Sequence, residues 1–286
     1  MNEIQSMMTG VIRENRKVAS DQFMMTVILP PSFPIPAPGQ FVMVREANRG
    51  EPLLARPLSV YGFQKQDDHA VLELLYRLAG RGTILFSKMK PGDEVALIGP
   101  LGKGFTIPEG LTRVLFIAGG VGVAPLIFLL QDRFLTAETE KGKKPIFYLG
   151  ARNVNLLVGL ERLNGLCDLK LCTDDGSQGY HGPVTELLKS EIEGYDPKET
   201  VIFACGPTPM ILSLGRLLKD NPIPCQVSIE ERMACGLGAC LGCVVAIRGP
   251  GRKREYVRVC LEGPVFDLKE VLPTSSVDMQ GSENES

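Results

Sequence analysis

The cysteines are the feature that most narrows what this chain can fold into. Four of its eight cysteines lie in one short segment that begins at Cys235 and ends at Cys260. Cys235, Cys240 and Cys243 have the spacing C-x4-C-x2-C, which is typical of plant-type [2Fe–2S] clusters, and Cys260 supplies a fourth thiolate. The glycines between them allow the backbone to approach the bridging sulfides closely. We therefore expect residues 230–272 to form a small [2Fe–2S] domain.

A structural zinc site is the alternative that these four thiols leave open. Zinc sites of this kind usually contain two C-x2-C pairs, whereas this segment contains only one, Cys240 and Cys243. Disulfides are a poor explanation, because eight cysteines in 286 residues are too few for a disulfide scaffold. The spacing therefore favours the iron–sulfur cluster over zinc.

The first part of the chain, residues 1–105, has the pattern of short strands separated by turns. A proline-rich loop, residues 30–38, excludes a regular element there. Several short strands at close spacing favour a small antiparallel β-barrel. The expected strands are Met8–Val18, Gln22–Leu29, Gly39–Val44, Val71–Arg77 and Asp93–Gly99, with one helix over Arg81–Met89.

Residues 106–229 alternate between short apolar strands and helices. This alternation is typical of a parallel sheet covered by helices on both faces, so the whole chain is expected to be a multidomain β plus α/β protein. The expected strands are Arg113–Ala118, Pro145–Ala151, Leu169–Thr173, Thr200–Cys205 and Pro224–Ile229. The expected helices are Val123–Phe134, Asn155–Leu163, Pro183–Ile192 and Thr208–Lys219. Residues 273–286 are polar, and we expect them to be disordered.

One stretch, Val114–Leu130, carries no charge and imitates a membrane span. Its central glycines and proline favour a strand, a glycine turn and a helix over one continuous helix. The N-terminus lacks the apolar core of a secretory signal. These features predict a cytoplasmic protein that does not enter a membrane.

Charge and histidine content exclude several functions. Lys and Arg total 31 and Asp and Glu total 33, so the net charge of −2 offers no basic excess for nucleic acid. The only histidines, His69 and His181, provide little material for histidine-rich metal sites or Ser-His-Asp catalysis. No carboxylate pair, Glu230 and Glu231 included, has a second feature that would mark acid–base chemistry. We therefore expect no catalytic residue for an organic substrate.

Short motifs in the barrel region suit a flavin nucleotide. In the sequence RPLS, Arg56 offers a forked donor set for a pyrophosphate, and Ser59 follows for the edge of a flavin ring. The sequences LYR (75–77) and RGT (81–83) add a second arginine and an amide-rich turn before a helix, which suits an anion. Solvated surface charge is the simpler explanation of each motif alone, so the argument depends on their combination.

A glycine turn in the α/β region suits a dinucleotide. The sequence AGGVGVAP (118–125) lets backbone amides approach a phosphate, although it lacks the full G-x-G-x-x-G fingerprint and an ordinary tight turn is the alternative. CGP (205–207) follows a later strand, and Cys205 is either a core residue or a nicotinamide contact. Asp174 and Asp175 follow another strand and favour the ribose 2′-OH of NAD, whereas Arg152 favours NADP. The cysteines expected to pack in the core are Cys167, Cys172 and Cys225.

These motifs occur together in one order, and in that order the chain resembles the ferredoxin–NADP reductase superfamily extended by a C-terminal [2Fe–2S] domain. Within it, the chain is most similar to the electron-transfer subunits of NAD-linked dihydroorotate dehydrogenases. The resemblance covers about residues 8–272. Its most specific part is the sequence MACGLGACLGC, followed by VRVC and by GPVFDLKEV (263–271).

The resemblance implies three cofactor sites. FAD would contact Arg56, Pro57, Leu58, Ser59, Leu75, Tyr76, Arg77, Gly82 and Thr83. NAD would contact Gly119, Gly120, Val121, Gly122, Asp174, Cys205, Gly206 and Pro207. The ligands of the [2Fe–2S] cluster would be Cys235, Cys240, Cys243 and Cys260.

The resemblance also implies a partner and a path. The partner would be a separate FMN-containing subunit that oxidises dihydroorotate to orotate in pyrimidine biosynthesis, in a heterotetramer of two copies of each chain. Electrons would pass from the partner through the cluster and FAD to NAD+, because flavin exchanges both single electrons and hydride. The alternatives are the flavin subunit of an NADH-dependent ferredoxin–NADP reductase, sulfide dehydrogenase or hydrogenase complex, and, in another class, a zinc-stabilised interaction module.

Overall fold

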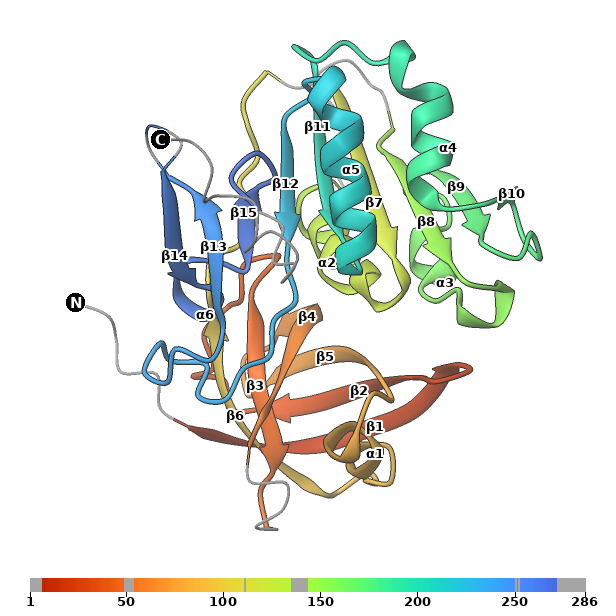
Figure 1. The fold of residues 1–286 in the computed structure, drawn as a ribbon. Helices are drawn as coiled ribbons and strands as arrows, with labels where there is room; N and C mark the ends of the chain where they lie inside the picture. Colours follow the sequence, from red (N-terminus) through yellow and green to blue (C-terminus); the bar gives the residue numbers. More distant parts are fainter. Residues whose placement is uncertain are drawn as a thin grey trace.

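The computed structural model describes residues 7–48, 54–110, 112–134, 144–249, 251 and 253–271. Figure 1 shows three parts: a β-barrel at the bottom, a helix-covered sheet at the upper right, and the C-terminal segment on the left, beside both. The predicted disorder of residues 273–286 concerns positions outside the described residues. Among the described residues, no helix is long and apolar enough to cross a membrane.

Six antiparallel strands close into a barrel in the order β1-β2-β5-β4-β3-β6, which confirms the predicted barrel. Helix α1 (Arg81–Phe86) follows β5 in the sequence. Apolar side chains that alternate along the strands fill the interior, as the period of two in a half-buried strand requires. The strands are β1 (Met8–Ala19), β2 (Gln22–Leu29), β3 (Phe41–Glu46), β4 (Arg56–Lys65), β5 (Ala70–Arg77) and β6 (Glu94–Leu101).

Strand β4 departs from the prediction. The motif RPLS opens this strand, and none of the predicted strands includes β4. A β-bulge between Val60 and Gly62 shifts the pairing of β4 with β5. The bulge breaks the alternation of inward and outward residues, which is the signal on which strand prediction depends.

A seven-stranded sheet forms the α/β part, in the order β10-β9-β8-β7-β11-β12-β15. Helix α2 (Val123–Arg133) packs on one face, and α4 (Val184–Glu191) and α5 (Thr208–Asp220) pack on the other. This confirms the predicted doubly covered sheet, and Val114–Leu130 forms the expected strand, glycine turn and helix. The parallel strands are β7 (Arg113–Gly119), β8 (Ile146–Ala151), β9 (Asp168–Thr173), β10 (Tyr180–His181), β11 (Thr200–Cys205) and β12 (Cys225–Ser228).

The predicted helix Asn155–Leu163 is wrong. The segment forms a 3-10 turn at Val154–Leu156 and a short helix α3 (Leu160–Leu163). Gly159 separates the two with a left-handed φ of 81°. A Cβ there would lie 2.5 Å from Ile127 Cδ1, so packing against α2 determines the break rather than local helix propensity.

The C-terminal segment contacts both other parts of the molecule. After the hairpin and helix, strand β15 pairs antiparallel with β12 and so becomes an edge of the sheet. The elements are β13 (Val244–Arg248), β14 (Arg254–Arg258), α6 (Val259–Glu262) and β15 (Val265–Asp267). One apolar cluster joins this segment to the barrel wall, and its members include Phe41, Met43, Leu101, Cys243, Val259, Cys260 and Phe266.

Candidate cofactor sites

A cleft of about 240 Å³, here called the barrel cleft, lies between β4, β5 and the start of α2. The structure brings all the predicted FAD residues except Gly82 to its walls, although the three motifs RPLS, LYR and RGT are separate in the sequence. The other parts of the molecule complete the walls with Val121, Ala124, Ser228, Glu230, Met233 and Pro264. The barrel cleft is therefore shared by all three parts of the chain.

Gly82 lies behind the wall of the barrel cleft and makes room for Arg56. A Cβ at this position would lie 2.5 Å from Arg56 Nε, so the glycine leaves room for the guanidinium. Arg56 Nη1 donates a hydrogen bond to the Leu54 carbonyl at 2.7 Å. Thr83 Oγ1 accepts a hydrogen bond from the Ala79 amide at 2.9 Å and so orders the turn before α1. A guanidinium beside an ordered turn is a donor set that suits a pyrophosphate.

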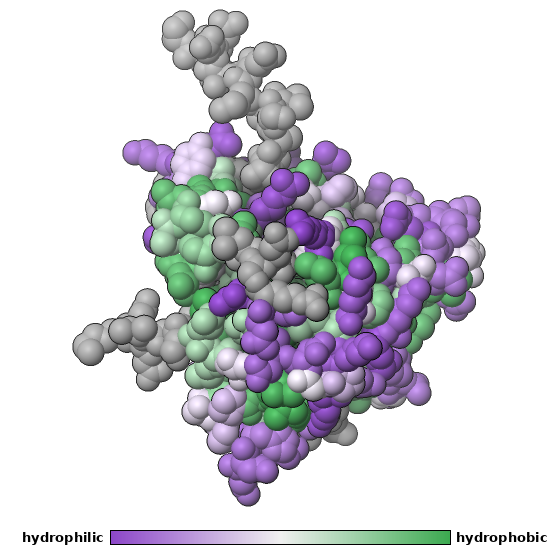
Figure 2. Space-filling model, turned by 90° about the horizontal axis from the view of Figure 1, so that it is seen from below, coloured by the Kyte–Doolittle hydropathy of each residue, from purple (hydrophilic) through white to green (hydrophobic). Residues whose placement is uncertain are grey.

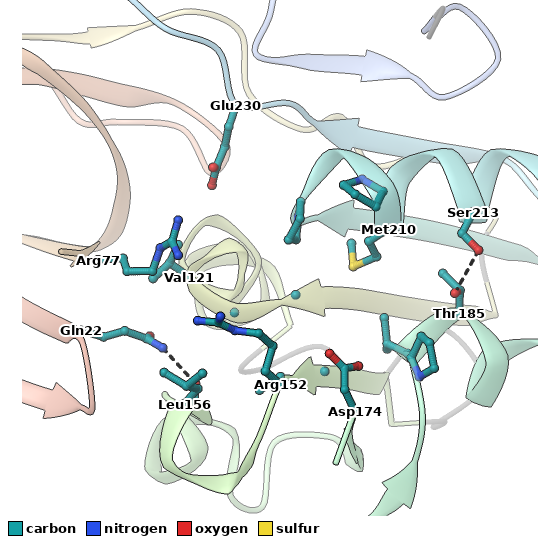
Figure 3. A pocket seen from close by; sticks show the side chains of 18 of the residues that line it. Gln22, Arg77, Val121, Arg152, Leu156, Asp174, Thr185, Met210, Ser213 and Glu230 are labelled. Carbon is teal, nitrogen blue, oxygen red and sulfur yellow. Dashed lines mark hydrogen bonds between the residues drawn. The ribbon is translucent and has the colours of Figure 1, made fainter. Parts of the chain in front are cut away.

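A larger cleft of about 720 Å³, here called the sheet cleft, opens at the carboxyl ends of the parallel strands (Figure 3). Strand β7 lies at its centre, and the chain continues from β7 to β8 on one side and later to β11 on the other. Such a change of direction is the usual ligand site of open α/β sheets. The predicted NAD residues in its lining are Gly119, Gly120, Val121, Asp174 and Pro207.

The predicted residues Gly122, Cys205 and Gly206 lie behind this lining. A Cβ at Gly122 would overlap the Cys205 carbonyl, and a Cβ at Gly119 would lie 2.8 Å from Pro207 Cδ. The missing side chains therefore let the two turns pack together. Gly120 has a φ of 55°, and no atom lies within 4 Å of a Cβ built on it. This open backbone fits the close approach of a dinucleotide phosphate.

The Cys205 thiol belongs to the core. The residue is 1% exposed and packs in the apolar cluster between the sheet and α2. Burial raises the pKa of this thiol, and the nearby Glu230 carboxylate raises it further. Of the two interpretations of Cys205, the structure favours core packing. The cysteines predicted to be buried, Cys167, Cys172 and Cys225, are also buried.

Arg77, Val121 and Glu230 line both clefts, which therefore meet at these side chains (Figure 3). Glu230 is absent from the predicted site residues. Its position just after a strand of the sheet, at the same edge as the glycine turn, is the signal that identifies it. Glu230 is exposed to both clefts, where apolar and polar side chains of the barrel and the sheet lie around it. Desolvation by these surroundings raises its pKa, and the Arg77 guanidinium only partly opposes the change.

Asp174 and Arg152 both point into the sheet cleft (Figure 3). The neighbouring Asp175 has a local role, because it accepts hydrogen bonds from the Ser177 amide at 3.0 Å and from Ser177 Oγ at 2.6 Å. The Ser177 hydroxyl lowers the pKa of Asp175. Of the two aspartates considered for a ribose, only Asp174 lines the cleft. The sequence pattern also misses Gln22, which reaches the sheet cleft from the barrel.

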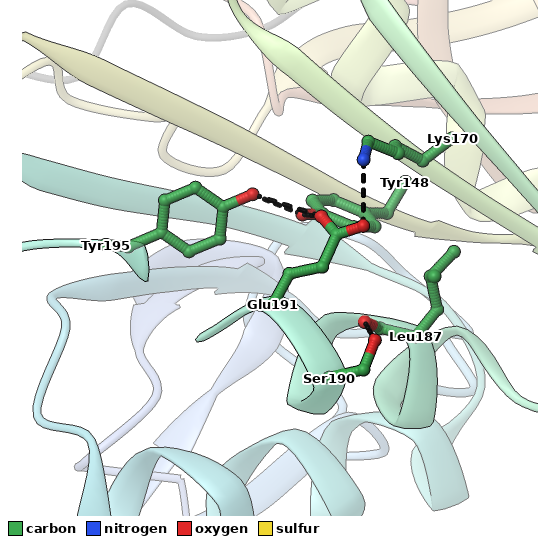
Figure 4. Close-up of polar contacts among 6 residues, drawn as sticks. All are labelled: Tyr148, Lys170, Leu187, Ser190, Glu191 and Tyr195. Atoms are coloured by element: carbon green, nitrogen blue, oxygen red, sulfur yellow. Dashed lines mark hydrogen bonds and ion pairs between the residues drawn. The ribbon is translucent and has the colours of Figure 1, made fainter. Parts of the chain in front are cut away.

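Helix α4 reaches the sheet cleft with its first residues and is anchored at its other end by Glu191 (Figure 4). Glu191 Oε1 lies 2.8 Å from Lys170 Nζ, and Glu191 Oε2 accepts a hydrogen bond from Tyr148 Oη at 2.6 Å. Tyr195 Oη also donates to Glu191 Oε2, at 3.3 Å. Burial opposes ionisation of Glu191, but the hydrogen bonds from Lys170 and Tyr148 prevail and lower its pKa.

The four clustered cysteines come together as two pairs. The thiols of Cys235 and Cys240 are close enough to influence each other's titration, and so are those of Cys243 and Cys260. A [2Fe–2S] cluster needs two thiolates on each of its two irons, and this arrangement fits that requirement. Within the described part of the chain, no three His, Cys, Asp or Glu side chains are placed around a single metal position.

Backbone amides support these thiols. The Leu237 amide donates to Cys235 Sγ and the Gly242 amide donates to Cys240 Sγ, each at 3.4 Å. Burial raises the pKa of Cys235, but amide hydrogen bonds from Leu237 and Cys240 prevail and lower it to about 7. Gly236 and Gly238 take φ angles of 70° and 76° in this loop, which is the left-handed region that glycine tolerates. The predicted role of these glycines is consistent with this geometry.

Two family models match the chain. The iron-sulfur cluster binding domain of dihydroorotate dehydrogenase B matches residues 230–272, and the oxidoreductase NAD-binding domain matches residues 116–214. In the solved structures, the chain is similar to an NADH-dependent reduced ferredoxin–NADP oxidoreductase, with a TM-score of 0.76 and 29% identity. That match covers 92% of this chain and 89% of the other. A ferredoxin NADP+ reductase from Neisseria gonorrhoeae, at 22% identity and a TM-score of 0.63, shares the fold.

Curated relatives are similar over nearly the whole chain. The dihydroorotate dehydrogenase B (NAD(+)) electron transfer subunit of Desulforamulus reducens is 39% identical over 256 residues, which is 89% of this chain and 94% of the relative. The subunit of the same name from Caldanaerobacter subterraneus subsp. tengcongensis is 38% identical and covers 93% of this chain and 98% of the relative. The chain belongs to the family of dihydroorotate dehydrogenase B electron transfer subunits.

Proposed function

We propose that this chain carries electrons between a dihydroorotate-oxidising partner and NAD+. The observation that carries the proposal is the continuity of three sites. The sheet cleft meets the barrel cleft at Arg77, Val121 and Glu230. The barrel cleft in turn shares Phe41 and Met233 with the apolar cluster that contains Cys243 and Cys260.

Each site suits one cofactor. The barrel cleft of residues 1–105 would hold FAD, the sheet cleft of residues 106–229 would hold NAD(H), and residues 230–272 would hold a [2Fe–2S] cluster. NAD exchanges hydride, the cluster exchanges single electrons, and bound flavin converts one into the other. Oxidation of dihydroorotate to orotate releases two electrons and two protons. NAD+ takes up both electrons and one proton, and the second proton leaves to solvent.

The residues of this chain bind and orient the groups in this scheme. Arg56 lies beside the turn before α1 and would neutralise the flavin pyrophosphate. Val121 stands between the two clefts, where the reacting rings would meet. Asp174 would accept hydrogen bonds from the ribose hydroxyls of NAD and repel the 2′-phosphate of NADP. Arg152, on the same wall, would instead favour the 2′-phosphate of NADP.

The cluster site has one face at the surface, which suits electron exchange with a partner. Cys240 is exposed, whereas Cys243 and Cys260 are buried. Leu237 and Leu241 on the same loop are 46% and 61% exposed, and we call them the cluster lip. In Figure 2, hydrophobic side chains gather on the left of the face, the side on which the C-terminal segment lies in Figure 1. The partner would be an FMN-containing catalytic subunit, in a heterotetramer with two copies of each chain.

An anaerobic assay on the tagged chain, isolated together with its native partner, tests the proposal. NADH formation is followed after dihydroorotate is added, with each subunit alone as the control. Turnover that requires both subunits supports the proposal. If NADH reduces the flavin but dihydroorotate produces no NADH, electron transfer between NADH and flavin is supported. Dihydroorotate is then rejected as the substrate of the complex.

A further inference from the structure

Arg162 joins the α/β part to the barrel at a point outside both clefts. It extends from α3, and its Nη2 lies 2.7 Å from Glu73 Oε1 on β5. The guanidinium also lies over the ring of Tyr61 on β4, with Cζ 4.1 Å from the ring centroid. The Arg162 and Glu73 side chains are 18% and 21% exposed, so water only partly screens their ion pair.

The barrel leaves space for this contact at Gly62. A Cβ at that position would overlap the Glu73 carboxylate and would lie 3.1 Å from Arg162 Nη1. Gly62 lies at the β-bulge of β4. The bulge and the absence of a side chain together leave the space that the ion pair occupies. On the α/β side of the contact, the backbone of Gly159 lies close to Tyr61, since a Cβ at Gly159 would be 3.2 Å from Tyr61 Oη.

Residues 153–163, which we call the docking segment, make further contacts with the barrel. The Ser20 amide donates to the Asn155 carbonyl at 3.0 Å, and Gln22 Nε2 donates to the Leu156 carbonyl at 2.9 Å. The segment begins directly after Arg152, which lines the sheet cleft. One short stretch therefore connects the wall of the sheet cleft to four residues of the barrel: Ser20, Gln22, Tyr61 and Glu73.

We propose that Arg162 is a positioning residue, which fixes the orientation of the α/β part on the barrel and so the approach of nicotinamide to flavin. This inference rests on the proposed function. Hydride transfer requires the reacting atoms to lie about 3–3.5 Å apart, and the two rings would be held by different parts of the chain. Apolar packing of α2 on the barrel is non-directional, whereas a charge-assisted hydrogen bond to one carboxylate has a defined direction.

Three variants test this role in the protein loaded with FAD and cluster: Arg162→Gln, Glu73→Gln and the double variant. The matched control is Glu14→Gln, which also removes the acidic partner of an ion pair, but one that lies within the barrel and lines neither cleft. Stopped-flow absorption measures reduction of the flavin by NADH, and its dependence on NADH concentration separates rate from binding. Small-angle X-ray scattering, before any NADH is added, reports the arrangement of the two parts independently of activity.

We expect each single variant to slow flavin reduction by about tenfold to a hundredfold, with the half-saturating NADH concentration changed by less than about twofold. The double variant should be no slower than either single variant, because both remove the same interaction. The distribution of interatomic distances obtained from scattering should broaden in these variants, and Glu14→Gln should match the wild type in both measurements.

Wild-type flavin reduction in Arg162→Gln or Glu73→Gln would overturn the inference, and so would single-variant effects that multiply in the double variant. If Arg162→Gln does not retain FAD, Glu73→Gln decides the question, because it is isosteric and breaks the same pair. A wild-type protein whose flavin NADH cannot reduce would instead contradict the proposed function, so the two failures are distinguishable.

Discussion

Glu230 and Arg77 face each other where the sheet cleft meets the barrel cleft (Figure 3). Glu230 follows β12 of the sheet, and Arg77 ends β5 of the barrel. Because desolvation raises the pKa of Glu230 despite the guanidinium, the junction holds a carboxyl that is more readily protonated than an ordinary glutamate. The pair therefore places a pH-sensitive group between the two proposed cofactor sites.

This raised pKa predicts how stability changes with pH. The folded chain binds the Glu230 proton more tightly than the unfolded chain, so the free energy of unfolding declines as pH rises from the ordinary pKa of glutamate through the raised one. Glu230→Gln should remove this part of the decline. Urea unfolding of the cofactor-free chain at a series of pH values measures it, and an identical slope in the variant would contradict the assignment.

Glu191 predicts a pH dependence of the opposite sign. Its pKa is lowered in the folded chain, so it contributes stability above the ordinary pKa of glutamate that is lost as pH falls through the lowered one. Glu191→Gln should reduce the free energy of unfolding at neutral pH by about 1 kcal/mol, and the difference should shrink in acid. The same urea series provides the measurement. A deficit that grows as the pH falls would refute this expectation.

The cysteine pairs predict which substitutions prevent cluster assembly. Cys240→Ser should abolish the iron and acid-labile sulfide of the purified protein while FAD remains, because the barrel cleft does not include this side chain. Iron, sulfide and flavin analyses provide the measurement. Cys167→Ala is the control, since this thiol is buried in the α/β core and should leave the cluster intact. Full iron and sulfide in Cys240→Ser would show that the ligand set is different.

Asp174 predicts the choice between NADH and NADPH. Asp174→Ser should reduce the preference for NADH by about tenfold or more, because it removes a charged acceptor for the ribose hydroxyls and the repulsion of a 2′-phosphate. Flavin reduction rates with each dinucleotide give the ratio. Asp175→Asn should leave the ratio unchanged, since that carboxylate is bonded to Ser177. An unchanged ratio in Asp174→Ser would assign the choice to another residue.

The cluster lip predicts the position of the partner. Leu241→Glu should weaken binding of the catalytic partner by about tenfold or more, because it places a charge in an apolar contact. Reduction of the flavin by NADH should remain normal, since Leu241 lines neither cleft. Ile84→Glu, at another exposed apolar residue, is the control. Affinity measured with immobilised partner checks the expectation, and equal binding by both variants would place the interface elsewhere.

Local patterns were sufficient for much of the fold. The strand Gln22–Leu29 has the predicted bounds, because it is a short β-type run that Pro30 and Pro31 end, and Val114–Leu130 divides as its central glycines indicate. The cysteine spacing is likewise local and led directly to the segment that the family model matches. These features depend on neighbours within a few residues, which a single sequence displays.

The parts that sequence reasoning missed depend on contacts between distant residues. The break at Gly159 follows from its approach to Ile127 and Tyr61, which no local pattern contains. Strand β15 has only three residues and exists because β12 offers an edge for pairing. Glu230 gains its significance from Arg77, on a different part of the fold. Its position after a strand marks it as a candidate, but only the assembled barrel and sheet bring it close to Arg77.

The return of the C-terminal segment to the sheet has a consequence for how the protein matures. Met233 and Pro264 complete the wall of the barrel cleft, and β15 supplies the last strand of the sheet. A nascent chain that ends before residue 230 therefore lacks one side of the flavin cradle, however well its barrel has folded. Tight flavin binding and cluster insertion should thus both require that residues 230–272 have been synthesised. A product truncated before them should contain neither cofactor and should be colourless.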